Sequence, residues 1–145
     1  MTTINRHALT QHSADQMYAL INDIEAYPEF LQWCRSAKII ARDEDTITAK
    51  LELAKGGLHK EFTTRNRLMT GKLIEIKLVE GPFNHLEGFW RFEPLTESAC
   101  KVILDLDFDF KNSMLDIVMG PVFTQVANTL VDSFVSRARQ VYERA

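Results

Sequence analysis

Three aspartates recur at every second position in the stretch KVILDLDFDF, as Asp105, Asp107 and Asp109. Alternate residues of a strand stand roughly 6.6 Å apart, which is too far for a single metal ion to bridge them comfortably. The same spacing is expected where one face of an antiparallel sheet meets water. We therefore interpret the row as a solvated strand face and predict no metal site.

The 4 histidines, at positions 7, 12, 59 and 85, do not have the spacing of zinc ligands. The chain also lacks the glycine and serine motifs of hydrolases, phosphate-binding loops and dinucleotide-binding folds. His85, beside Asn84 at the entrance of a predicted strand, is the one side chain that we nominate for proton transfer. A solvent-accessible loop histidine needs no catalytic role, so we predict a protein that is not an enzyme and has no cofactor.

Composition indicates one domain over residues 1–145, because 46% apolar and 26% charged residues are typical of a globular chain of this length. The first residues have neither the basic start nor the apolar centre of a signal peptide, and no run of 18 apolar residues follows. We therefore expect a cytoplasmic protein without an integral membrane segment. Cys34 and Cys100 lack a C-x-x-C spacing, and we expect both to be reduced and packed in the interior.

The net charge of −3 argues against general affinity for nucleic acid, and we predict no DNA partner. Basic residues nevertheless gather in two places, and each group is either a local phosphate-binding patch or an ordinary solvated face. The first group is Lys55, Lys60, Arg65 and Arg67, and the second is Arg137, Arg139 and Arg144.

The elements that position these residues change type twice along the chain. Residues 3–9 are predicted to form a strand, and Ser13 with Gln16 forms a capping box that begins a helix. A second short helix is predicted around Pro28, with Phe30, Leu31 and Trp33 on its apolar side. From residue 36 to 110 the apolar residues alternate with a period of two, which indicates a continuous antiparallel meander with one apolar face.

After residue 112 the period returns to 3.6 residues and predicts a helix long enough to cross the sheet. Its expected apolar stripe is Leu115, Val118, Val122, Val126, Leu130, Phe134 and Val141. Gly120-Pro121 is expected to kink or split this helix, either for steric reasons alone or as the base of a lid. The fold class is therefore α+β, a curved sheet of about seven strands around a long C-terminal helix, with two short helices after the first strand.

Small and polar residues occupy inward-facing positions of the predicted meander, namely Ala49, Thr64, Asn66 and Gly88. Such residues suit the wall of a ligand cavity better than a packed core. Each cavity residue taken alone also fits an ordinary core. We predict that the wall comprises Leu51, Leu53, Phe62, Thr64, Ile76, Trp90, Phe92, Val122, Phe123, Val126 and Leu130.

The order of elements, with YPEFLQWC, FTTRN and LVEGPFNHLEGFWRFEPL, resembles the coenzyme-Q-binding branch of the START-like superfamily of polyketide cyclases and lipid transport proteins. The resemblance covers about Thr3 to Tyr142. It implies a helix-grip fold, a hydrophobic tunnel, and ubiquinone or a related prenyl lipid as the ligand, in support of respiration. Within the branch, the chain is most similar to bacterial toxins that bind the large ribosomal subunit and block subunit association.

Two other functions therefore remain open beside the binding and carrying of such a lipid. A ribosome-binding protein needs exposed basic residues near phosphate, and we predict Lys55, Lys60, Arg65 and Arg67 as that contact, with an antitoxin as a further partner that the resemblance implies. The alternative is a cyclase or aromatase acting on a polyketide or aromatic substrate in the cavity, because some START-like relatives are such enzymes.

Overall fold

Nearly the whole chain forms regular secondary structure in the computed structural model, which describes residues 1–143. Arg144, part of the second basic group, therefore lies outside the described residues. As predicted, the first strand is followed by two short helices, six further strands and a long last helix. The elements are β1 (Thr2–Thr10), α1 (Ala14–Asn22), the 3-10 helix η1 (Ile24–Glu29), β2 (Cys34–Arg42), β3 (Thr46–Lys55), β4 (Leu58–Met69), β5 (Leu73–Glu80), β6 (Phe83–Thr96), β7 (Ala99–Phe110) and α2 (Ser113–Tyr142).

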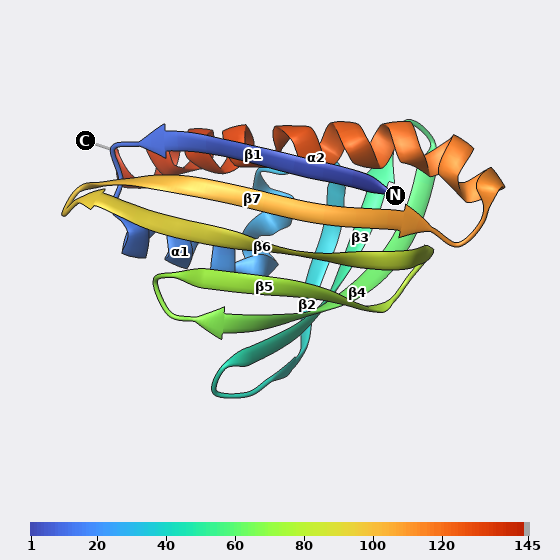
Figure 1. The fold of residues 1–145 in the computed structure, drawn as a ribbon, viewed down its shortest axis with the longest axis horizontal. Helices are drawn as coiled ribbons and strands as arrows, with labels where there is room; N and C mark the ends of the chain where they lie inside the picture. The colour runs from blue at the N-terminus through green and yellow to red at the C-terminus, as the bar shows by residue number, and fades with distance from the viewer. Residues whose placement is uncertain (144–145) are drawn as a thin grey trace.

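The strands form one 7-stranded antiparallel sheet in the order β1-β7-β6-β5-β4-β3-β2 (Figure 1). From β2 to β7 each strand pairs with the next one along the chain, so the predicted meander is confirmed. The first strand is different, because β1 pairs with β7, with Thr2 opposite Phe108 and Thr10 opposite Cys100. The two ends of the strand region therefore meet at one side of the sheet.

The sheet has an inner face, turned toward α2, and an outer face on the opposite side. Along β7 the side chains of Val102, Leu104, Leu106, Phe108 and Phe110 are buried on the inner face, as their alternation predicts. The three aspartates between them face outward, where Asp107 accepts a hydrogen bond from Thr3 and Asp105 accepts one from Asn5. These aspartates are thus the solvated row that their spacing indicates.

The helix α2 crosses the inner face and is capped by Asn112, whose side chain accepts a hydrogen bond from the backbone of Leu115 (Figure 1). Its buried side chains follow steps of three and four residues, and they are Met119, Phe123, Val126, Ala127, Val131, Phe134, Val135 and Ala138. The predicted stripe was wrong at Val118 and Val141, which are 52% and 37% exposed. From Phe134 back to Val118 the stripe runs in four-residue steps, each of which turns by about 40°, so Val118 leaves the buried face. Val141 lies in the last turn of α2, which ends at Tyr142.

The helix continues through Pro121, so the predicted split is not found. Proline removes one backbone hydrogen bond, and the neighbouring turns hold the helix together across that gap. Within the described residues, α2 is also the one helix long and apolar enough to cross a bilayer. In this fold its apolar residues from Phe123 to Ala138 pack against the sheet instead.

The two short helices close one end of the space beneath α2. Ser13 and Gln16 form the predicted capping box at the start of α1, with reciprocal hydrogen bonds of 3.1 and 3.0 Å. The second helix is a 3-10 helix that ends at Glu29, so Phe30, Leu31 and Trp33 follow it rather than forming its apolar side. A short 3-10 turn accommodates Pro28, whose ring would disturb a longer α-helix. Cys34 and Cys100 are buried free thiols, as expected.

Candidate ligand cavity

A cavity of about 90 Å³ lies between α2 and the inner face of the sheet. One wall comes from strands β3 to β7, the other from α2, and the two short helices with the loop after η1 close one end. The lining side chains are Ile21, Ile24, Tyr27, Trp33, Ala49, Leu51, Phe62, Thr64, Asn66, Ile74, Ile76, Leu86, Trp90, Leu106, Phe123, Val126, Ala127, Leu130 and Phe134. Most of this surface is hydrocarbon, so the cavity suits an apolar ligand.

Two aromatic groups hold the cavity open along α2. Phe123 contacts Phe108 with ring centroids 4.8 Å apart, and Phe134 contacts Trp90 at 5.4 Å, both edge to face. These two α2 residues are eleven positions apart, which is about 16 Å along a helix. Between them in sequence, Ala127 lines the cavity from α2, and Ala49 lines it from β3. Small side chains between two rigid aromatic groups leave space that the surrounding residues do not fill.

A polar pair interrupts the apolar wall on β4. The Thr64 hydroxyl donates to the Asn66 carbonyl oxygen at 3.2 Å, and both side chains are at least nine-tenths buried. Within residues 1–143 the Asn66 amide nitrogen has no hydrogen-bond partner. The hydrogen bond with Thr64 uses the Asn66 oxygen and leaves the amide N–H groups free to donate, so a ligand with a hydrogen-bond acceptor at this point is favoured.

Tyr27 is the lining residue with a phenol. Its hydroxyl donates to the backbone carbonyl of Ile21, which fixes the ring at the α1 end of the cavity. Burial raises the pKa of Tyr27 far above its usual value, with smaller contributions from the nearby Cys34 and Asp23. The phenol therefore stays neutral and serves as a wall, because it is neither a ready proton donor nor an anion at physiological pH.

Most of the residues predicted to line a cavity do lie in its wall. These are Leu51, Phe62, Thr64, Ile76, Trp90, Phe123, Val126 and Leu130. The prediction was wrong for three others, because Leu53 and Phe92 are buried in the core away from the cavity and Val122 is a half-buried neighbour of that core. The alternation of Leu53 and Phe92 is correct, since both are buried on the inner face, but neither borders the cavity.

Sequence reasoning missed the contribution of the two short helices and the loop after them. Ile21 and Ile24 line the cavity from α1 and η1, and Trp33 does so from the loop. The signal was present in the sequence, since the apolar stripe of the first helix has to pack on something. Periodicity alone did not indicate whether this apolar stripe packs directly on the sheet or borders an internal space.

Two other predictions about this region need correction. His85 pairs with Asp109 across β6 and β7, and its Nε2 lies 3.7 Å from a carboxylate oxygen of Glu87 on the outer face. The one residue nominated for proton transfer in cyclase chemistry is therefore outside the cavity.

Gly88 does not enlarge the cavity either. A Cβ placed there would lie 2.0 Å from the backbone oxygen of Asp105, so this glycine permits close packing of β6 on β7. Among the described residues no group of three potential metal ligands occurs.

The predicted basic contact is divided between the two faces of the sheet. Arg65 and Arg67 are exposed on the outer face. Lys60 lies opposite Leu53, and Lys55 lies opposite Leu58, so both lysines share the side of the sheet that faces α2. Alternate residues of a strand point to opposite faces, so these four residues cannot form one patch.

With the geometry established, the comparisons with known proteins identify the family. The chain is 46% identical over 141 residues to the ribosome association toxin RatA of Pseudomonas aeruginosa, covering 97% of this chain and 98% of that protein. It is 25% identical over 136 residues to the Xenopus laevis mitochondrial coenzyme Q-binding protein COQ10 homolog B, covering 91% of this chain and 56% of that protein. These relatives are not named as enzymes.

The crystal structure of the Zhui aromatase/cyclase from Streptomyces sp. R1128 has the same fold. It superposes with a TM-score of 0.87 at 17% identity, covering 99% of this chain and 96% of that one. The predicted helix-grip fold is thereby confirmed. The family model described as polyketide cyclase / dehydrase and lipid transport matches residues 10–135, and the chain belongs to that family.

Proposed function

We propose that this protein is a non-enzymatic binding protein whose cavity holds an apolar ligand with a carbonyl oxygen, of the prenyl quinone class to which ubiquinone belongs, and that it associates with the large ribosomal subunit. The observation that supports this class of ligand is the Thr64–Asn66 pair in an otherwise apolar cavity. A quinone matches both features, because its ring oxygens accept hydrogen bonds and its prenyl tail is hydrocarbon.

The size of the cavity limits how such a ligand is held. About 90 Å³ is less than the roughly 150 Å³ of an apolar cavity that admits benzene. A quinone ring or a full tail therefore requires the wall to move outward, or most of the ligand to lie beyond the cavity. Five of the lining residues are partly exposed, namely Tyr27, Trp33, Leu51, Ile76 and Leu130.

Ligand binding is tested by native mass spectrometry of protein purified from its host, followed by thermal unfolding with added ubiquinone. A co-purifying quinone and a higher melting temperature are expected, because a ligand at a hundred times its Kd stabilises the folded state by about 2.7 kcal/mol. Repeatedly empty preparations, together with no thermal shift, would remove this part of the proposal.

The role of Asn66 is tested with an apolar variant of similar size, Asn66→Leu. We expect quinone affinity to fall about tenfold, since the lost hydrogen bond is worth on the order of 1.4 kcal/mol. Binding of a prenyl hydrocarbon without oxygen should not fall. Thr63→Val is the control, because Thr63 is buried on the same strand but does not line the cavity. Equal loss of both ligands in Asn66→Leu would show that the residue only shapes the wall.

Ribosome association is supported by the relatives rather than by the cavity. A protein that shares 46% identity over nearly its whole length is named a ribosome association toxin. We therefore also propose a cytoplasmic location, and an antitoxin as a further partner. Co-sedimentation with ribosomal subunits in sucrose gradients at low salt tests ribosome association, and absence from the large-subunit fractions would count against the assignment.

A further inference from the structure

The outer face of the sheet carries a contiguous group of exposed cations on β2 to β5. We call it the outer basic surface, and it consists of Lys38, Lys50, Arg65, Arg67 and Lys77. These residues share one face because each lies opposite another outward-facing residue in the register. Three strand spacings separate β2 from β5, so the group spans roughly 15 Å across the sheet.

The register places like charges directly opposite each other. Lys38 lies opposite Lys50, and Arg65 lies opposite Lys77. Directly opposed side chains have Cβ atoms about 4.5–5.5 Å apart, and like charges at that distance are destabilising. The free protein thus has two unfavourable pairs on one surface, and a bound polyanion would relieve both.

These cations have few partners within the protein. Among residues 1–143, Lys50 alone of the five has a carboxylate within ion-pair distance, Glu61 at 3.1 Å. A solvated face usually intersperses its charges so that they neutralise one another. Here the other four charges have no carboxylate within that distance. Glu75 lies opposite Arg67 in the register, so Lys38, Arg65 and Lys77 are the cations available to an external partner.

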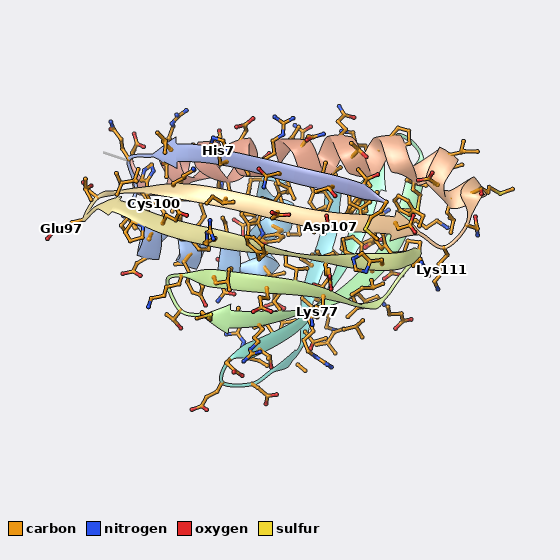
Figure 2. The ribbon with its side chains drawn as sticks, viewed as in Figure 1. His7, Lys77, Glu97, Cys100, Asp107 and Lys111 are labelled. Atoms are coloured by element: carbon orange, nitrogen blue, oxygen red, sulfur yellow. The ribbon has the colours of Figure 1, made fainter. Side chains whose placement is uncertain are left out.

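The other half of the outer face is richer in carboxylates. Across the boundary, Lys77 on β5 lies opposite Glu87 on β6, and Glu87 lies opposite Asp107 on β7. Figure 2 labels Lys77 on β5 and Asp107 on β7, on the side of the sheet turned to the viewer. Asp105 and Asp107 accept hydrogen bonds from β1, so they have partners within the fold. An approaching polyanion is attracted to β2–β5 and repelled by β6–β7, which fixes its orientation.

We propose that the outer basic surface is the face through which the protein contacts the phosphates of ribosomal RNA. This inference rests on the proposed ribosome association and says which surface performs it. A net charge of −3 does not prevent such a contact, because Lys38, Lys50, Arg65 and Lys77 adjoin one another in the register. The carboxylates on the same face, Glu52, Glu61 and Glu75, lie at the borders of this group. The cavity lies on the other face, so ligand and RNA are bound independently.

The test compares two double variants with the same change of charge. Arg65→Glu/Lys77→Glu alters the outer basic surface, and Lys55→Glu/Lys60→Glu alters the side that faces α2. Binding to purified large subunits is measured by co-sedimentation over a range of salt concentrations, after circular dichroism has verified the fold of each variant. The outer variant should bind at least about tenfold more weakly, and its salt slope should fall by roughly 1.4 because two phosphate contacts are lost. The Lys55/Lys60 variant should behave like the wild type.

The outcomes separate the two proposals. If the wild type binds but the outer variant binds equally well, or the Lys55/Lys60 variant loses binding, the surface assignment is overturned and ribosome association stands. If the wild type does not bind, both are overturned. A further arm uses vesicles of phosphatidylglycerol. Binding to vesicles that depends on Arg65 and Lys77, without binding to ribosomal subunits, would assign the surface to a membrane and overturn the RNA contact.

Discussion

Filling the cavity with protein atoms is expected to stabilise the empty protein and to abolish ligand binding. Ala49 is 1% exposed and lines the cavity from β3, so Ala49→Leu adds three carbon atoms directly into the hollow. A residual cavity costs about 24 cal/mol per Å³, which gives roughly 2 kcal/mol for a volume of about 90 Å³. That is the upper limit of the gain in unfolding free energy, and the melting temperature should rise by up to about 6 °C.

The matched control places the same side chain where no cavity exists. Ala138 on α2 is 0% exposed and does not line the cavity, so Ala138→Leu should lose about 1–3 kcal/mol through overpacking. Unfolding is followed by heat and by urea, with and without ubiquinone. If Ala49→Leu were as destabilised as Ala138→Leu, the space beside Ala49 would be closed in solution. If it kept the full thermal shift with ubiquinone, the ligand would bind elsewhere.

Further measurements address the packing of β6 on β7 and the two thiols. Gly88→Ala should cost at least about 3 kcal/mol in urea unfolding, because its Cβ would lie 2.0 Å from the Asp105 backbone oxygen. Gly57→Ala, which meets no atom within 4 Å, should cost only about 1 kcal/mol from its positive φ, and equal losses would contradict the clash. Burial raises the pKa of both Cys34 and Cys100 to about 11, so native protein at pH 8 should react slowly with iodoacetamide. Reaction at the rate of unfolded protein would show that the thiols are accessible.

The sheet was predictable because its signal is local. Each strand from β3 to β7 alternates apolar and polar residues, and a period of two determines which side chains share a face. The same rule shows why the basic group was wrong. Lys60 and Arg65 differ by an odd number of positions on β4, so proximity in sequence placed them together while the strand geometry separates them. The outer basic surface needs the register of four strands, which sequence periodicity does not supply.

The cavity was only partly predictable because an empty space depends on how side chains from distant elements meet. Alternation correctly placed Thr64 and Trp90 on the inner face, but Leu53 and Phe92 are on that face too and do not border the hollow. Whether an inward residue touches another residue or a void depends on the positions of α2, α1 and η1 above it. The stripe of α2 failed at Val118 for a related reason, since four-residue steps rotate away from the sheet.

The pairing of β1 with β7 has a consequence for synthesis. Thr10 is made ninety residues before its partner Cys100, and translation at about 5–20 residues per second separates them by roughly 5–20 s. During that interval the N-terminal strand has no neighbour for its backbone N–H and C=O groups. Closing so long a loop is slow compared with forming a hairpin, so the last step of folding waits for a nearly complete polypeptide.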